Sequence, residues 1–305
     1  MDRGDGLIGD ENKGPRSAAS YLKPLLENYG GLRGPAPITT GFQFLDQAMG
    51  GWRPGLHLVA GEPGCGKSSL ALHTSQAAAQ EGFGVIYLSF ETEPEVLVLR
   101  MLCQQNGWDQ RVALDGEIEQ AELERAAAEA SEPLDRMSIV RADPTMEIAA
   151  LQDLAGGVVA RSDRDRCLIV IDYLQVWAAG SRQFSEFRHE IAKLTSSLRR
   201  LSIDLSSPVL AISSQNRSNQ GEPILSSLEG TSDLEYSADS ICFLIHVERS
   251  ANQRGYLPPE EALRKSRTVS LSLRKNHFGE VGSRVIKFMP QSGGFDEESM
   301  QRTGA

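Results

Sequence analysis

The segment from Gly61 to Ser68 has the residue types and the spacing of a phosphate-binding loop. It reads GEPGCGKS, fits the pattern GxxxxGK[ST], and stands between an apolar run and a helical one. Its glycines allow the backbone to curve closely around phosphate oxygens, and the N-terminus of the following helix adds positive potential. We therefore expect seven residues to contact a nucleotide: Gly61, Gly64, Cys65, Gly66, Lys67, Ser68 and Ser69.

Two side chains at the end of this loop, and one farther along the chain, complete a metal and phosphate site. Lys67 is expected to reach the β- and γ-phosphates, and the Ser68 hydroxyl is expected to ligate Mg²⁺. Asp172 ends the run CLIVID, which is apolar without alternation and therefore typical of a buried strand. A carboxylate at such a strand end can hold the water shell of Mg²⁺. The sequence thus predicts a P-loop ATPase that binds ATP and Mg²⁺.

Three further positions follow predicted strands, and each has two interpretations. Glu91 follows VIYLSF, where a carboxylate can polarise an attacking water or cap a helix near Thr92. Gln215 ends PVLAISSQ, where an amide can contact the γ-phosphate and report hydrolysis, or can simply be a polar strand end. The basic cluster from Arg274 to His277 is either a solvated edge or a source of positive charge for a neighbouring subunit's nucleotide.

Composition limits the class of protein. The chain has 305 residues, of which 40% are hydrophobic and 6% aromatic, as in an α/β domain with an aliphatic core. The net charge of −10 argues against a protein that coats nucleic acid with its whole surface, but not against a local basic groove or pore. Four widely spaced cysteines without a CxxC pair are typical of free thiols in a reducing cytosol. With neither a transmembrane run nor a signal peptide in the sequence, we expect a soluble cytoplasmic protein without a membrane partner.

Apolar runs and helical runs alternate along the chain. The expected strands are 56–60, 85–90, 167–172, 208–213, 240–247, 268–274 and 285–289. The expected helices are 67–80, 97–104, 117–130, 148–160 and 187–205. Such alternation predicts an α/β fold with a mainly parallel sheet and helices on both faces. The last strands have little helix between them, which predicts an antiparallel extension of the sheet.

The chain is expected to divide into three parts. Residues 1–37 are predicted to form a disordered tail followed by a linker helix at residues 17–29. Residues 38–290 form the globular ATPase domain, and residues 291–305 form a polar, loose C-terminal tail.

Several phrases, in this order, resemble the RecA-like motor domain of DnaB-type replicative DNA helicases over about residues 38–292. They are ITTGF, GEPGCGKSS, LSFE, VIDYLQ, ISSQNR, EYSAD and the Arg274-Lys275 pair before Gly279. IDYLQ and SQNR are far more specific than a P-loop alone. The resemblance implies a RecA-like P-loop NTPase core in which Glu91 is the catalytic carboxylate and Gln215 the sensor. It also implies that Lys275 acts on the nucleotide of a neighbouring subunit.

The same resemblance implies an assembly and a task. Members form hexameric rings with ATP between subunits and single-stranded DNA in the central channel, and hydrolysis drives 5′→3′ translocation in DNA replication. The linker helix at residues 17–29 is expected to pack on the adjacent subunit, as linker helices of this family do.

Three departures from the family pattern qualify this expectation. About 37 residues precede the motor in place of a helical N-terminal domain, so we expect a loader or partner protein. His277 stands at the arginine-finger position, and a neutral imidazole lacks the permanent, forked charge of a guanidinium. Glu229 stands in the loop after the sensor where an arginine is expected, leaving Arg182 and Arg217 as candidate DNA contacts.

Two other functions stay open at this point. A regulatory ATPase of the RecA or KaiC type would use its nucleotide state to control a protein partner without translocating, and His277, Glu229 and the acidic net charge favour it. A nucleotide-stabilised scaffold would not hydrolyse at all, and Glu91 beside an intact loop argues against it.

Overall fold

The computed structural model describes residues 17–27, 29, 35–180, 187–215, 223–228, 232–247 and 266–297. The chain divides into two compact units, Met1–Ala36 and Pro37–Ala305. In the first unit, a 3-10 turn η1 (Ala18–Tyr21) runs into the short helix α1 (Leu22–Glu27), so a helix forms within the segment predicted for the linker. Its Leu22 and Leu26 side chains are exposed.

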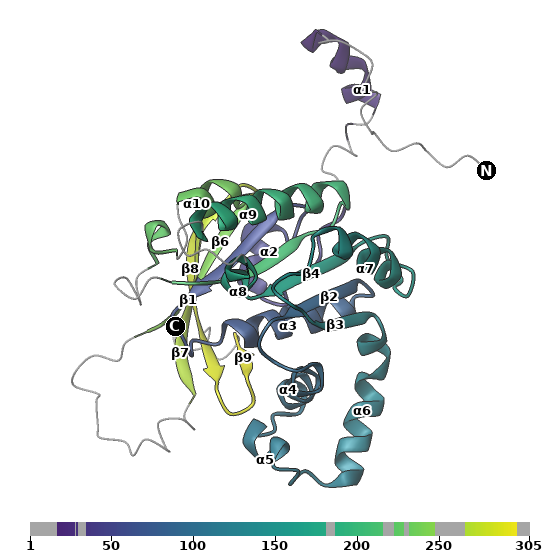
Figure 1. The fold of residues 1–305 in the computed structure, drawn as a ribbon, viewed down its shortest axis with the longest axis vertical. Coiled ribbons are helices and arrows are strands. Elements are labelled where there is room, and N and C mark those ends of the chain that lie inside the picture. Colours follow the sequence, from purple (N-terminus) through teal and green to yellow (C-terminus); the bar gives the residue numbers. More distant parts are fainter. Residues whose placement is uncertain are drawn as a thin grey trace, which may run out of the picture. The chain divides into compact units, whose positions relative to one another are not determined.

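The second unit is built around a nine-stranded sheet with the order β3-β2-β4-β5-β1-β6-β7-β8-β9 (Figure 1). The strands are β1 (Leu56–Gly61), β2 (Gly84–Ser89), β3 (Met137–Arg141), β4 (Cys167–Asp172), β5 (Val209–Ser214), β6 (Ser240–His246), β7 (Arg267–Asn276), β8 (Gly282–Met289) and β9 (Gly294–Asp296). From β3 to β6 neighbouring strands are parallel, and from β6 to β9 they are antiparallel. The predicted parallel sheet and its antiparallel extension are both present.

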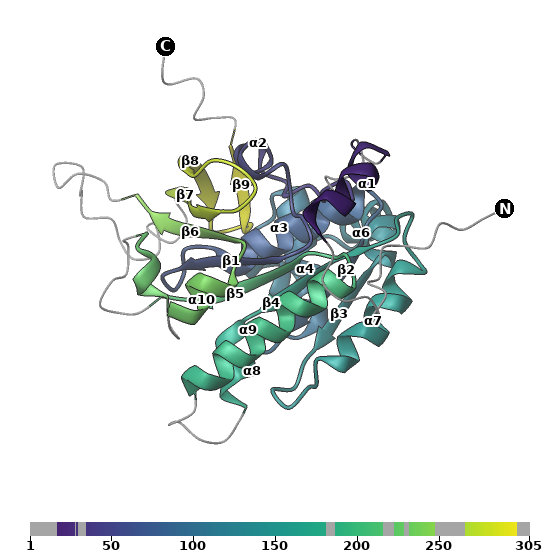
Figure 2. The same ribbon diagram turned by 90° about the horizontal axis from the view of Figure 1, so that it is seen from above.

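Helices cover both faces of the sheet, as Figure 2 shows from above. They are α2 (Gln43–Met49), α3 (Lys67–Gln80), α4 (Pro94–Asn106), α5 (Gln110–Leu114), α6 (Gln120–Asp135), α7 (Ala149–Val159), α8 (Leu174–Ala179), α9 (Phe187–Asp204) and α10 (Ser232–Ser237). One core packs α2, α3 and α4 against the sheet, and the other packs α7, α8 and α9 against its opposite face. None of the helices in the described ranges combines the length and the apolar character needed to span a membrane.

The central strands show why their sequences are apolar without alternation. Along β2, Val85 and Tyr87 face the core under α3, whereas Ile86 and Leu88 face the core under α7 and α8. Both faces are thus covered, and each side chain of the strand is buried.

The folded part of the chain continues past residue 290, where the sequence placed the start of a loose tail. Strand β9 pairs with β8, and the Glu297 carboxylate accepts hydrogen bonds from the backbone N–H groups of Gln43 (2.7 Å) and Phe44 (2.9 Å). A carboxylate at this position satisfies donors that the first turn of α2 leaves open. The C-terminal hairpin therefore belongs to the sheet and holds the start of α2.

Candidate active site

The glycine-rich loop joins the carboxyl end of β1 to the N-terminus of α3, as predicted. Gly66 stands directly before α3 with φ 100°, and a Cβ atom there would lie 3.0 Å from the Phe288 ring. Gly64 has φ 76°, and no described atom lies within 4 Å of the place that its Cβ would take. Both conformations favour glycine. The loop is followed by the first N–H groups of α3, which have no partner within the helix.

Lys67 and Ser68 lie at the start of α3 with their polar groups at the loop. The Lys67 ammonium donates hydrogen bonds to the backbone oxygens of Gly61 (2.9 Å) and Glu62 (2.8 Å), and the Ser68 hydroxyl hydrogen-bonds Asp172. A lysine at a helix N-terminus suits phosphate, and a hydroxyl beside a carboxylate supplies the oxygen ligands that Mg²⁺ prefers. The donor set fits a nucleoside triphosphate with Mg²⁺.

Two carboxylates lie at the carboxyl ends of neighbouring strands. Asp172 ends β4 opposite Ser89 of β2, and Glu91 follows β2 two residues later. Burial raises the pKa of Asp172, and the nearby Glu91 charge adds to this, while hydrogen bonds from Tyr87 and Ser68 and the Lys67 charge lower it. The two carboxylates are therefore close enough to interact electrostatically.

Gln215 lies at the end of β5, the strand beside β1. Its side chain is buried, and its Nε2 donates to the Ser227 hydroxyl at 2.8 Å, next to an isolated bridge between Gln215 and Leu228. Gln175 of the IDYLQ phrase ties α8 to β5 from the other side, since its Nε2 donates to the Ser213 hydroxyl at 2.8 Å. The predicted sensor thus links a strand next to the P-loop to the segment that follows β5.

We use 'edge' for the side of the sheet at which the strands end: the P-loop lies at the carboxyl end of β1. Lys275 and His277 lie at the opposite edge, beside the amino ends of β1 and β6. Strand β7 is antiparallel to β6, so Asn276 is paired with Ser240 and Ser240 with His57, at the amino end of β1. The P-loop begins at Gly61, roughly 13 Å farther along that strand. Neither residue of the basic cluster is therefore brought to the P-loop of its own chain.

Both side chains are held by contacts within the chain. The Lys275 ammonium donates to the backbone oxygens of Glu235 (2.6 Å) and Tyr236 (3.3 Å). The His277 Nδ1 lies 3.2 Å from an Asp239 carboxylate oxygen, and the His277 backbone N–H donates to the Asp239 backbone oxygen at 2.9 Å. Asp239 also accepts two hydrogen bonds from Arg199, at 2.9 and 3.1 Å.

The candidate DNA contacts lie outside the described residues. Arg182 falls in the segment between α8 and α9, and Arg217 falls in the segment after β5, as does Glu229. Their predicted roles stay predictions.

Two tyrosines beside the carboxylates were not singled out by the sequence analysis. The Tyr87 hydroxyl donates to Asp172 Oδ2 at 2.7 Å, and the Tyr173 hydroxyl donates to Glu91 Oε1 at 3.0 Å. The available signal was the tyrosine inside the otherwise aliphatic run of β2, because a buried hydroxyl needs a hydrogen-bond partner.

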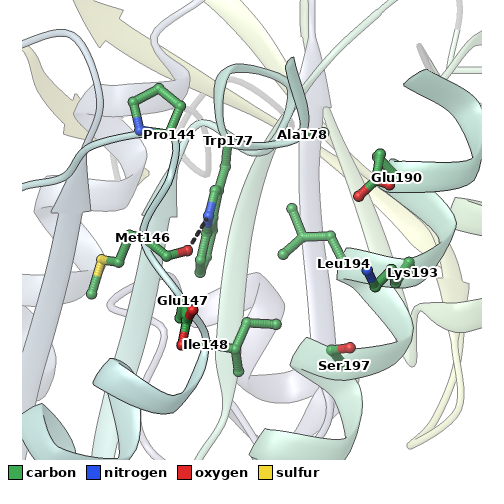
Figure 3. Close-up of a pocket in the computed structure, with 10 residues that line it drawn as sticks. All are labelled: Pro144, Met146, Glu147, Ile148, Trp177, Ala178, Glu190, Lys193, Leu194 and Ser197. Carbon is green, nitrogen blue, oxygen red and sulfur yellow. Dashed lines mark hydrogen bonds between the residues drawn. The ribbon is translucent and has the colours of Figure 1, made fainter. Parts of the chain in front are cut away.

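A pocket of about 310 Å³ lies between the segment before α7, α8 and α9 (Figure 3). The Trp177 ring stands in it, and its indole N–H donates to the Met146 backbone oxygen at 3.0 Å. Glu147, Glu190 and Lys193 lie at its sides. No residue of the P-loop lines this pocket.

Comparison with known proteins assigns the family. The model of the DnaB-like helicase C terminal domain matches residues 37–297, most of the chain. The chain belongs to this family. The resemblance in the sequence motifs is thereby confirmed.

Individual relatives agree with this assignment. The chain is 26% identical over 319 residues to the replicative DNA helicase DnaB of Pasteurella multocida, which covers 95% of this chain and 63% of the relative. It is 27% identical to that of Haemophilus influenzae over 288 residues, 91% of this chain and 58% of the relative. The chain thus spans less than two thirds of the length of these relatives.

Solved structures confirm the fold. One of them, an isolated ATPase domain, superposes with a TM-score of 0.73 at 21% identity, covering 92% of this chain and 99% of that domain. A DnaB-like replicative helicase, solved to describe its interactions with primase, gives a TM-score of 0.72 at 19% identity, covering 93% and 67%. The predicted RecA-like ATPase core is therefore the fold of this member of the family.

Proposed function

We propose that this chain is an ATP-hydrolysing helicase motor that acts at subunit interfaces and moves 5′→3′ on single-stranded DNA in DNA replication. The observation that carries the proposal is the division of the polar groups between two edges of one sheet. Lys67, Ser68, Asp172 and Glu91 gather at the edge with the P-loop, while Lys275 lies at the other edge. In a ring of identical chains two different surfaces meet at every interface, and in this proposal those surfaces are the two edges.

Each residue of the P-loop edge has a task in this proposal. The loop N–H groups and Lys67 bind the triphosphate, and Ser68 and Asp172 hold Mg²⁺, which neutralises phosphate charge when bound. Glu91 orients the attacking water and accepts its proton. Gln215 contacts the γ-phosphate and transmits its loss to the segment after β5. Lys275 of the neighbouring subunit supplies positive charge.

The assembly that this mechanism needs is a homo-oligomer, which we propose to be a hexameric ring around single-stranded DNA. Arg182 and Arg217 are the proposed DNA contacts, and a loader or partner protein places the ring on DNA in the cytoplasm. His277 and Glu229 replace arginines of the family pattern, so we expect slower turnover and weaker salt-dependent DNA binding than in a standard member.

A regulatory ATPase that controls a protein partner is the second candidate function. One observation favours it: His277 is engaged by Asp239 of its own chain and stands where a helicase places its arginine finger. In that case nucleotide turnover would be slow and would not depend on DNA.

Steady-state ATP hydrolysis separates these functions. We expect turnover at low salt that rises with single-stranded DNA and with protein concentration through the range of ring assembly, and strand separation of a forked duplex with a 5′ tail. Lys67→Ala is the inactive control. Turnover indifferent to DNA would contradict the helicase and support the regulator, and absent turnover at every concentration would contradict both.

A further inference from the structure

The two carboxylates of the P-loop edge are each held by a different tyrosine. Tyr87 lies within β2 and Tyr173 directly follows Asp172 at the end of β4. Each phenol hydroxyl donates to one carboxylate, Tyr87 to Asp172 and Tyr173 to Glu91. The resulting pairs join strands and loops that are more than eighty residues apart in sequence.

The Tyr87 contact is built into the core. Its ring is fully buried among the residues under α3, and its hydroxyl reaches diagonally from β2 to the last residue of β4, because Tyr87 is paired with Val170 and Ser89 with Asp172. Burial raises the pKa of Tyr87, and the Asp172 charge raises it further, so the phenol keeps its proton and donates. The Tyr87 hydroxyl thus fixes one oxygen of Asp172 from the core side, at 2.7 Å.

The Tyr173 contact restrains a group that is otherwise exposed. Glu91 lies on the connection between β2 and α4, with its side chain in solvent, and a free glutamate populates many rotamers. Tyr173 stands at the N-cap of α8 and holds Glu91 Oε1 at 3.0 Å. The residue before Glu91 is fixed to the same helix, since the Phe90 ring packs on Trp177 of α8 with centroids 5.6 Å apart.

We propose that these tyrosines are positioning residues with separate tasks: Tyr87 fixes Asp172 for the metal, and Tyr173 fixes Glu91 for the attacking water. The inference rests on the proposed function, because it assigns those roles to the two carboxylates. Tyr173 directly follows Asp172 in the chain and stands at the N-cap of α8. The proposed base Glu91 and the proposed metal ligand Asp172 are therefore both positioned by the start of α8.

The first test is the magnesium dependence of Tyr87→Phe, which deletes one hydroxyl and keeps the ring. We expect the Mg²⁺ concentration for half-maximal ATP turnover, and that for half-maximal binding of a fluorescent ATP analogue, to rise about tenfold, as for loss of a group that orients a metal ligand. Thr74→Val is the matched control, because it deletes a buried hydroxyl that accepts from the Trp52 indole at 2.7 Å in the same core. An unchanged Mg²⁺ dependence in Tyr87→Phe, or an equal shift in Thr74→Val, would overturn the task of Tyr87.

The second test is Tyr173→Phe, alone and combined with Glu91→Gln. Alone, it should lower kcat about tenfold with KM and the Mg²⁺ dependence close to wild type. In the Glu91→Gln background it should have no further effect, because the residue through which it acts is already neutralised. Wild-type kcat in Tyr173→Phe, or an equal loss in both backgrounds, would overturn its task. Tyr173 is half-buried, so this test holds even if Tyr87→Phe does not fold.

Failure of the inference and failure of the proposed function give different results. If wild-type protein hydrolyses ATP and Glu91→Gln does not, the site stands, and normal behaviour of both tyrosine variants contradicts only the inference. If Glu91→Gln hydrolyses ATP like wild type, the assignment of Glu91 itself is contradicted.

Discussion

The two edges of the central sheet use their polar residues differently. At the P-loop edge, Lys67 donates to the loop backbone and Ser68 hydrogen-bonds Asp172. At the other edge, Lys275 and His277 are taken up by the α10 carbonyls and Asp239 of their own chain. The first edge is arranged as a binding site, and the second as a rigid support for charged side chains.

This difference teaches how the antiparallel extension is used. Reversal of strand direction at β7 puts its carboxyl end beside the amino ends of β6 and β1. A residue at the carboxyl end of β7, such as Lys275, is therefore separated from the P-loop of its own chain by most of the length of β1. Under the proposed function, Lys275 acts on the nucleotide of another subunit, and its contacts with α10 hold its ammonium group in place.

The largest effect is expected at the P-loop edge, from Glu91→Gln. Loss of the general base should reduce ATP turnover by about 10²–10⁴, while nucleotide affinity stays near wild type, since the glutamine keeps the shape and the binding groups are intact. Turnover and fluorescent-nucleotide binding are measured on the same preparation. Glu93→Gln, an exposed neighbour whose carboxylate lies 3.4 Å from the Arg141 Nε, is the control and should behave as wild type. Equal losses in both variants would contradict a specific role of Glu91.

A smaller effect is expected at the other edge, from Asp239→Asn. The Asp239 pKa is lowered, because the hydrogen bonds from Arg199, the Leu56 N–H and His277 and the Arg199 charge outweigh burial, which raises it. Removing this charge should lower the free energy of unfolding by about 2 kcal/mol, less than for a fully buried pair because Arg199 reaches solvent. Asp204→Asn, in a surface pair with Arg200, should change little. Urea unfolding at pH 7.5 measures the free energy of unfolding of both variants, and equal losses would contradict this prediction.

The pH dependence of stability probes the same edge through His57. This residue is fully buried on β1 between Ser240 and Arg53, and burial lowers its pKa to about 4 from 6.5. Between pH 6.5 and about pH 4, His57 binds a proton in the unfolded chain but not in the folded chain. Stability therefore falls as the pH falls through this window. Between pH 7.5 and 5, wild type should lose about 2 kcal/mol more than His57→Gln. Equal losses in urea unfolding would contradict the buried, neutral state of His57.

Much of the fold is predictable from local sequence, and the strands that were not predicted have a physical reason in common: they depend on their neighbours in the sheet. Strands β1, β2, β4 and β5 are apolar because both of their faces are covered, so their positions follow from composition. Strand β3 was not predicted, because this edge strand is short and mostly half-exposed. Strand β9 has three residues and depends on its pairing with β8, so its polar sequence reads as a tail.

The candidate site divides in the same way. The P-loop and Asp172 are recognised because their chemistry is local: a turn of fixed geometry and a carboxylate at a strand end. The contacts of Tyr87 and Tyr173 depend on the register between β2 and β4, which no local pattern contains. The place of Lys275 at the far edge depends likewise on the direction in which β7 enters the sheet.

The most direct test of a shared site is a mixture of Lys67→Ala and Lys275→Ala chains. Each variant alone should hydrolyse ATP poorly, but roughly a quarter of the interfaces in a random mixture pair an intact P-loop with an intact lysine. We predict that mixing restores turnover to about that share of wild type. Mixing Lys67→Ala with Glu91→Gln should restore nothing, because both changes lie at one edge. No recovery in the first mixture, with both variants assembling normally, would contradict the account.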